Sequence, residues 1–575
     1  MVSDARALAT RLAELGDAAL ASTLAARGVS PQAGWHDFFD AAEGLLEPGS
    51  VDRALTRLDR DDLFALASRD AGVDGEPARL VLTDADGTPY AAVAERVAAA
   101  AAAAPQAFAA PPAPVEPAPA DARAAAAAAE RAFTTAGSLA DVLLLCSHAP
   151  LARTGAGPVS AVDRRRLMDA GALEFADDLE DLLAAAAGAG LATAHEREWA
   201  VTDAGERWLK APTAERWEAI AEGFRASLPR GLRTSSRGFL TPDSWPGMYP
   251  LDPEWPARTE RLHRIGVHWG LFASDRSPAE FPWTAALRAG ERADAASMAP
   301  YLPHEIDRVY LQADLTAIAP GPLAPALDLR LRSIALRESR AQASTYRFTA
   351  ESIGAGMTEG ETAESIRAFL ASLSLTGIPQ PLAYLIESTA ARHGLVRVRA
   401  DDATGRTRVE SPDAGLLDAI TVDQALRPLG LLVLEGDDAL SSRVARDAVY
   451  WTLADARYPV IALDARGVPE SIHRRTTATA SEPTATPQEA YARLIGALRG
   501  GHGTDGDSGW LERELEQAVR ARAEIVVVVR MPDGSERSFT LEAAGLGGGR
   551  LRGRDRAADI ERTLPVSSIV SVRAA

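Results

Sequence analysis

The 575-residue chain has one cysteine, one lysine and few aromatic residues. A lone thiol, Cys146, cannot form an internal disulfide, and it excludes zinc sites that need several thiolates. No stretch reaches the 18 or more apolar residues of a transmembrane helix, and charged residues interrupt residues 1–24 where a signal peptide would be apolar. We therefore expect a cytoplasmic protein with no membrane contact, no metal and no cofactor.

Positive charge is also scarce. The formal net charge is -19 and the isoelectric point is about 5.1. Because phosphate neutralisation drives most non-specific binding to nucleic acids, we do not expect electrostatic attraction between the protein as a whole and DNA. Any contact with DNA must be local. Arginine clusters are the local exceptions, and they form the candidate nucleic-acid-binding set: Arg164, Arg165 and Arg166; Arg230, Arg233 and Arg237; Arg550, Arg552, Arg554 and Arg556.

Residues 137–212 have the order of a winged helix, with three helices followed by a short strand pair. The third helix would enter the major groove of DNA in such a domain. It carries Asp177, Asp178, Glu180 and Asp181, which phosphates would repel. The basic triplet at 164–166 lies one helix earlier and could touch the DNA backbone, although a solvated helix face is the favoured interpretation.

Residues 213–305 are rich in tryptophan and arginine. Tryptophans beside arginines can form a stacking groove for single-stranded nucleic acid. In a region this poor in other aromatic residues, a buried core is the favoured interpretation. The five tryptophans in question are Trp217, Trp245, Trp255, Trp269 and Trp283.

Residues 307–399 read as strand, Pro-Gly-Pro turn, long helix, strand, helix, Pro-Gln-Pro turn, helix and strand. The segment 309–323, VYLQADLTAIAPGPL, resembles the start of the N-terminal domain of XPB-type DNA helicases and of bacterial proteins that carry this domain. The segments YRFT at 346–349, IRAFL at 366–370 and LTGIPQPLAYLI at 375–386, followed by His393-Gly394, stand in the order of that family. The resemblance implies a helicase-associated function.

A helicase motor requires more than this domain. Its phosphate loop is glycine-rich and ends in a lysine followed by serine or threonine. The only lysine, Lys210, follows Trp208-Leu209 and is not preceded by a glycine-rich segment. The Asp-Glu motif of the second motor element is also absent from the sequence. The sequence therefore predicts a protein that is not an enzyme.

The C-terminal segment, residues 484–575, alternates strands with Asp-Gly and Gly-Gly-Gly turns. It resembles a degenerate WYL-type module, an Sm-like barrel that senses nucleic acids or nucleotides in relatives. The Trp-Tyr-Leu signature is absent, and Ser568 stands where relatives carry an arginine before Ile569. Arg550, Arg552 and Arg554 alternate along one expected strand, so their guanidinium groups can point the same way and meet successive phosphates.

These observations predict a multidomain α+β protein. The expected units are a helical N-terminal domain (1–96), an Ala/Pro-rich linker (97–136), the winged helix (137–212), a Trp/Arg-rich helical region (213–305), the XPB-like α/β domain (306–400), an α/β extension (401–480) and a C-terminal β-barrel-like module (484–575).

The function we expect is that of a non-catalytic, helicase-associated adaptor or regulator that binds nucleic acid in DNA repair or transcription control. The expected ligand is DNA, single-stranded or forked in preference to duplex. A separate XPB-type helicase or the transcription machinery is the expected protein partner. The alternative is a protein-interaction scaffold that does not contact DNA, which the net charge and the acidic third helix favour.

Overall fold

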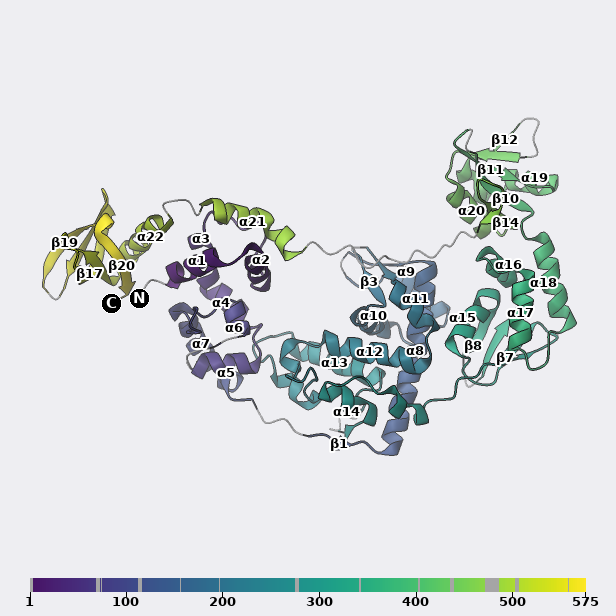
Figure 1. The fold of residues 1–575 in the computed structure, drawn as a ribbon, viewed down its shortest axis with the longest axis horizontal. Coiled ribbons are helices and arrows are strands. Elements are labelled where there is room, and N and C mark those ends of the chain that lie inside the picture. The colour runs from purple at the N-terminus through teal and green to yellow at the C-terminus, as the bar shows by residue number, and fades with distance from the viewer. Residues whose placement is uncertain are drawn as a thin grey trace.

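The computed structural model describes residues 4–574 except 69–72, 74, 112–115, 156, 196, 275–278, 341–342, 402–403, 435–438, 471–485, 502–505 and 557. It is a multidomain α+β structure in which helical regions alternate with small sheets (Figure 1). No helix within the described residues is both long and apolar enough to cross a bilayer. The threonine-rich stretch of the sequence that contains Arg474 and Arg475 lies outside the described residues.

The N-terminal region is a helical bundle with its own apolar core. Leu8, Leu12, Leu20 and Leu24 recur at helical spacing and are all fully buried in this core. The third helix starts where the Asp37 side chain accepts hydrogen bonds from the backbone N–H groups of the helix. The helices are α1 (Asp4–Glu14), α2 (Asp17–Ala26), α3 (Phe38–Leu46), α4 (Pro48–Leu55), α5 (Arg60–Ser68), α6 (Glu76–Arg79) and α7 (Ala91–Ala103).

A helix from the far end of the chain completes this bundle. In α21 (Pro487–Gly501), Leu494, Ile495 and Leu498 are buried in the N-terminal core, and α21 packs against α2. The Tyr491 hydroxyl donates to the carbonyl of Val29 at 2.5 Å. Figure 1 shows α21 lying along α2 and α3. Residues 487–501 fall within the segment expected to form the C-terminal module, but they share the core of the N-terminal bundle.

The middle region, from Ala125 to Met298, is organised around one continuous core. Helix also reaches into both ends of the expected 97–136 linker, because α7 ends at Ala103 and α8 begins at Ala122. A parallel pair of two-residue strands joins β1 to β5, and a three-stranded sheet has the order β2-β4-β3. The short helix η1 (Pro105–Phe108) packs into the core of the N-terminal bundle. The elements of the middle region are β1 (Ala118–Pro119), α8 (Ala122–His148), β2 (Leu151–Ala152), α9 (Ala161–Asp169), η2 (Ala176–Asp178), α10 (Leu179–Gly188), β3 (Ala192–Ala194), β4 (Glu198–Val201), α11 (Asp203–Lys210), α12 (Thr213–Ser227), η3 (Arg230–Leu232), η4 (Pro242–Gly247), α13 (Trp255–His268), β5 (Ala279–Glu280), α14 (Pro282–Ala289), η5 (Ala295–Ser297) and η6 (Ala299–Tyr301).

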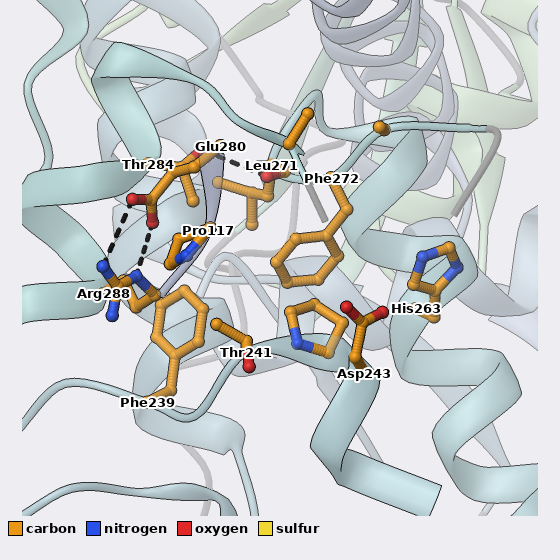
Figure 2. Close-up of a pocket in the computed structure, with 13 residues that line it drawn as sticks. Pro117, Phe239, Thr241, Asp243, His263, Leu271, Phe272, Glu280, Thr284 and Arg288 are labelled. Atoms are coloured by element: carbon orange, nitrogen blue, oxygen red, sulfur yellow. Dashed lines mark hydrogen bonds and ion pairs between the residues drawn. The ribbon is translucent and has the colours of Figure 1, made fainter. Parts of the chain in front are cut away.

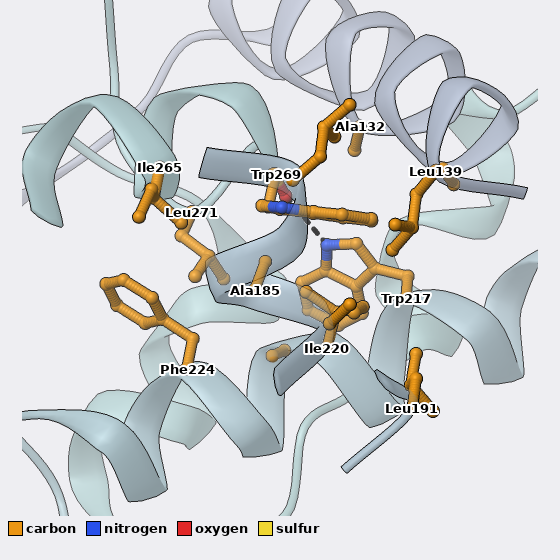
Figure 3. Packing of buried hydrophobic residues seen from close by; sticks show 14 of the residues in the cluster. Ala132, Leu139, Ala185, Leu191, Trp217, Ile220, Phe224, Ile265, Trp269 and Leu271 are labelled. Carbon is orange, nitrogen blue, oxygen red and sulfur yellow. Dashed lines mark hydrogen bonds between the residues drawn. The ribbon is translucent and has the colours of Figure 1, made fainter. Parts of the chain in front are cut away.

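The tryptophans of residues 213–305 are core residues, as the favoured interpretation predicted. All five are at most 2% exposed. Four of their five indole N–H groups donate to backbone carbonyls. Trp217, for example, donates to the carbonyl of Trp269 at 2.8 Å (Figure 3), and Trp283 donates to the carbonyl of Gly270 at 2.8 Å. A base cannot stack on rings enclosed in this way, so the stacking-groove hypothesis is wrong for these residues.

The next region has a small antiparallel sheet with the order β6-β7-β9-β8, packed against four helices. Thr349 and Thr362 form capping boxes with the serine three residues later, which fixes where α16 and α17 begin. Where the sequence predicts one strand before the Pro-Gly-Pro turn, the structure has the antiparallel pair β6 and β7. Where it predicts one strand after the long helix, the structure has the antiparallel pair β8 and β9. The elements are β6 (Tyr310–Leu311), β7 (Thr316–Ala319), α15 (Pro325–Ile334), β8 (Leu336–Arg340), β9 (Ser344–Arg347), α16 (Ala350–Thr358), α17 (Ala363–Leu373) and α18 (Gln380–Arg392).

The last expected strand of this region belongs to a different sheet. Strand β10 pairs with β11 and with β14, within the order β12-β13-β11-β10-β14-β15. Its valines, Val396 and Val398, are fully buried in the core of that second sheet. The elements are β10 (Val396–Asp401), β11 (Arg406–Glu410), α19 (Ala414–Val422), η7 (Gln424–Leu429), β12 (Leu432–Val433), β13 (Ala439–Ser442), α20 (Arg446–Asp455), β14 (Val460–Leu463) and β15 (Pro469–Glu470).

The C-terminal module is an open sheet and not the expected barrel. The strand order is β19-β18-β17-β16-β20, and β19 and β20 end the sheet without pairing with each other in its described part. Helix α22 covers one face, where Leu515 and Val527 are fully buried, and the opposite face carries no helix in Figure 1. The elements are α22 (Gly506–Ala521), β16 (Glu524–Arg530), β17 (Glu536–Gly547), β18 (Arg550–Asp555), β19 (Ile560–Pro565), η8 (Val566–Ser568) and β20 (Ile569–Ala574).

Candidate nucleic-acid interface

Two of the three arginines on α9 are engaged inside the protein. Arg164 donates to the carbonyl of Val159 and, at 2.7 Å, to the carboxylate of Glu180. Arg166 donates to the carbonyl of Ala149 at 3.0 Å. Arg165 is exposed. The triplet therefore offers one outward cation to a ligand, and its other two members hold the turns around α9 in place.

The third helix of this region, α10, is enclosed by its own protein. Ala187 is its only exposed residue, and α10 packs against α8, α12 and α13. The buried carboxylate of Asp181 accepts from Arg261 at 2.8 Å and from Arg264 at 2.6 Å. The acidic charge of α10 is therefore largely neutralised within the fold. Because its surface is already covered, α10 cannot enter a DNA groove in this conformation.

The three arginines of the second cluster, Arg230, Arg233 and Arg237, have different roles. Arg230 forms ion pairs with Asp59 and Asp62 of the N-terminal bundle. Arg233 donates to the carbonyl of Leu228 at 2.7 Å. Arg237 is exposed and sits at the tip of a turn, with φ of 67°. Arg230 and Arg164 bind different parts of the protein, since Arg230 contacts the N-terminal bundle and Arg164 contacts Glu180 of α10.

The third cluster has the alternation that its sequence indicated. Along β18, Arg550, Arg552 and Arg554 are exposed, while Leu551 and Asp555 point to the opposite, buried side. Successive outward residues of a strand are roughly 7 Å apart, so these cations form a row along one face of the sheet. This face is the one opposite α22.

The row is divided by its neighbours into a paired end and an open end. Arg554 forms an ion pair with Asp559 at 2.7 Å and lies across from Glu542 and Glu561 on the adjacent strands. Arg556 pairs with Glu542 at 2.9 Å. Carboxylates at this end compete with a phosphate for the same guanidinium groups.

At the open end, Arg550 and Arg552 form no ion pair with any described residue. Their partners across the ladder are Gly547 and Gly545 on β17, and Thr563 lies beside Arg552 on β19. A Cβ added at either glycine would meet nothing within 4 Å, so packing does not require glycine there. Glycine in a strand leaves the backbone open to close approach by a ligand. Sequence reasoning missed this division, because it depends on cross-strand register.

A small pocket in the tryptophan-rich region does not add a ligand site. Phe239, Phe272, His263 and Asp243 line it, and the Arg288 guanidinium at its rim donates to Glu280 at 2.6 Å (Figure 2). Its volume is about 40 Å³. That volume suits one or two water molecules and is far too small for a nucleotide. No cluster of three or more metal-binding side chains occurs among the described residues.

Sequence reasoning also missed a buried ion-pair network that joins α8 to the β6–β9 region. The Asp141 carboxylate, 3% exposed, accepts from Arg332 at 2.6 Å and from Arg337 at 2.5 Å. Asp328 accepts a hydrogen bond from the Tyr346 hydroxyl at 2.5 Å. Burial is the main cause that raises the pKa of Tyr346, and the negative charge of Asp328 raises it further. No local pattern around Asp141 signals partners that lie 191 and 196 residues away.

Comparison with protein families gives a match over part of the chain. The model of a family described as helicase conserved C-terminal domain matches residues 309–435. The match spans the β6–β9 sheet with its helices and continues into the second sheet as far as β12. No curated protein matches the chain. The match indicates a helicase-related domain, and it overlaps the region in which the sequence motifs lie.

Proposed function

We propose that this protein is a non-catalytic, helicase-associated adaptor or regulator that binds nucleic acid in DNA repair or transcription control. The helicase-family match at 309–435 is the observation that carries the proposal. Overlapping that match, we assign residues 306–400 to an XPB-type N-terminal-like domain, on the motifs of 309–323 and 375–386.

The nucleic-acid contact that we propose is the open end of the β18 row. Arg550 and Arg552 are exposed cations in a chain whose net charge is -19, and bare backbone at Gly545 and Gly547 lies beside them. Arginines there can contact phosphate oxygens and carry no base readout. The C-terminal module would therefore hold the sugar–phosphate backbone.

This contact does not favour single strands. Proteins that bind single strands present aromatic rings on which bases stack, and the five tryptophans considered for this role are buried. The one aromatic residue on the described strands of the C-terminal sheet, Phe539, pairs with buried Val527 and so faces the α22 side. Contact with the backbone alone is available to both single-stranded and duplex DNA.

The region from α8 to β4 supports the winged-helix assignment through its order of helix, strand, two helices and two strands. Because α10 is enclosed, we infer that this unit serves as a framework and not as a DNA reader. The same enclosure favours the alternative function, a protein-interaction scaffold, for this part of the molecule.

The proposal is tested by titrating fluorescently labelled single-stranded, forked and duplex oligonucleotides with the purified protein at several salt concentrations. We expect binding of all three forms, with affinity falling as salt rises. If none of the three forms shows salt-dependent binding, the adaptor function is refuted and the protein-interaction scaffold becomes the favoured function. In the same preparations, we expect no ATP hydrolysis with or without DNA, because the sequence has no phosphate loop.

A further inference from the structure

A groove runs beside the N-terminal half of α8, on the side where the chain approaches α10. Its walls are Glu130, Arg131 and Ser138 of α8, Glu174, Phe175 and Asp178 before α10, and His268 at the end of α13. Its volume is about 490 Å³. Pockets of a few hundred cubic ångströms can hold small ligands or the side chains of a bound peptide. We call it the α8–α10 groove.

An exposed aromatic ring forms part of one wall. Phe175 is 61% exposed, whereas its neighbours at the base of the groove, Leu173 and Leu182, are 6% and 3% exposed. Phenylalanine is mostly buried in folded proteins, so a ring presented at the rim of a cavity stands out from single exposed aliphatic residues. The face of such a ring attracts cations.

The charges of the groove favour a cationic ligand. It contains the carboxylates of Glu130, Glu174 and Asp178 and one arginine. Arg131 donates to the carbonyl of Val267 at the end of α13, at 3.3 Å, and burial lowers its pKa. Its guanidinium is thus held by the backbone of α13, although its charge still interacts with the Glu130 carboxylate. The three carboxylates and one guanidinium give a formal balance of -2 when histidine is not counted, in a chain that is itself acidic.

We propose that the α8–α10 groove binds an arginine- or lysine-bearing segment of a partner protein. A cationic side chain would lie against the Phe175 ring and pair with the carboxylates of Glu174 and Asp178, while Ser138 and backbone groups complete the polar contacts. The carboxylates exclude a phosphate backbone from the same place. The inference is independent of the β18 site, because the groove lies in the middle region and needs no nucleic acid.

The test uses a fluorescein-labelled octapeptide of alternating alanine and arginine, and its alternating alanine–glutamate counterpart, titrated with the full-length protein and followed by fluorescence anisotropy. Two variants alter the groove: Phe175→Ala, which changes no charge, and the triple variant Glu130→Gln, Glu174→Gln and Asp178→Asn. The matched control neutralises three exposed carboxylates on other elements, by Glu215→Gln, Asp294→Asn and Asp418→Asn. Thermal denaturation checks that each variant is folded.

We expect the arginine peptide to bind and the glutamate peptide not to bind. Loss of a cation–ring contact at an exposed site should weaken binding about two- to fivefold in Phe175→Ala. Loss of three surface charge contacts should weaken it about tenfold in the triple groove variant. The control should remain within about twofold of the wild type. Equal weakening in the control, or unchanged affinity in Phe175→Ala, would show only general attraction to an acidic protein and would overturn the proposal.

Discussion

Removing the buried carboxylate of Asp141 should loosen the attachment of the β6–β9 region to α8. Asp141 is 3% exposed, and the side chains of Arg332 and Arg337 that it binds are each 16% exposed. Burial tends to discharge an arginine, but the carboxylates of Asp141 and Asp328 outweigh it and raise the pKa of Arg337. Asp141→Ala would leave two guanidinium groups facing a cavity.

The free-energy cost of Asp141→Ala follows from the burial of this carboxylate and its arginine partners. Breaking a buried ion pair by removing one partner costs about 3–5 kcal/mol. Asp328 lies 3.6 Å from Arg332 and 3.8 Å from Arg337 and would retain part of the compensation, so the lower end applies. About 3 kcal/mol corresponds to roughly two orders of magnitude in the equilibrium for opening the interface.

Hydrogen–deuterium exchange of the α8 and α15 amides measures this opening without requiring the whole chain to unfold in one step. A matched control is Glu387→Ala, which removes a surface ion pair with Arg367 whose side chains are 54% and 55% exposed. Such a pair contributes about 0.2–1 kcal/mol. If exchange in Asp141→Ala rises no more than in the control, the network does not hold the two regions together.

Three further predictions concern other contacts. Burial first, and then the Asp59 carboxylate, raise the pKa of Asp62 from its ordinary 3.8 to about 7, although Arg230 opposes the shift. The folded state binds this proton more tightly than the unfolded state, so protonation of Asp62 stabilises the fold below about pH 4, and this stabilisation is lost as pH rises towards 7. The melting temperature of Asp62→Asn should therefore vary less with pH across this range than that of the wild type. Burial raises the pKa of Cys146 to about 11, so a thiol reagent at pH 8 should react slowly until the protein is unfolded, and rapid labelling of folded protein would contradict the buried position. Leu498→Ala should destabilise the N-terminal bundle by about 2–5 kcal/mol, seen as faster proteolysis of residues 4–68, because Leu498 is fully buried there; unchanged proteolysis would place α21 outside that core.

Local patterns predicted the exposed row on β18. The alternation of Arg550, Leu551 and Arg552 places the arginines on one face and the leucine on the other, and period-two patterning is the defining property of a strand. The pairing of Arg554 with Asp559 was not predictable, because it depends on how the turn after β18 returns to β19. The open and paired ends of the row therefore became visible only in the structure.

Long-range packing was beyond the reach of the sequence. The apolar residues of α21 indicate an amphipathic helix, but nothing near Leu498 specifies that its partner core lies in residues 4–108. The same holds for α10, whose acidic residues read as a repulsive DNA-facing surface although Asp181 is bound by Arg261 and Arg264. A charged residue on a helix signals exposure only when no later helix packs over it.

The most direct test of the proposed adaptor function is the salt dependence of DNA binding in two matched double variants. Arg550→Ala with Arg552→Ala removes the open end of the row, and Arg554→Ala with Arg556→Ala removes the paired end, so both variants lose two positive charges. We expect the first pair to lower affinity and to reduce the slope of log affinity against log salt by about 1.4 for single strands and about 1.8 for duplex. We expect a much smaller change for the second pair. Equal effects of the two pairs, or no effect of either, would contradict phosphate binding at Arg550 and Arg552.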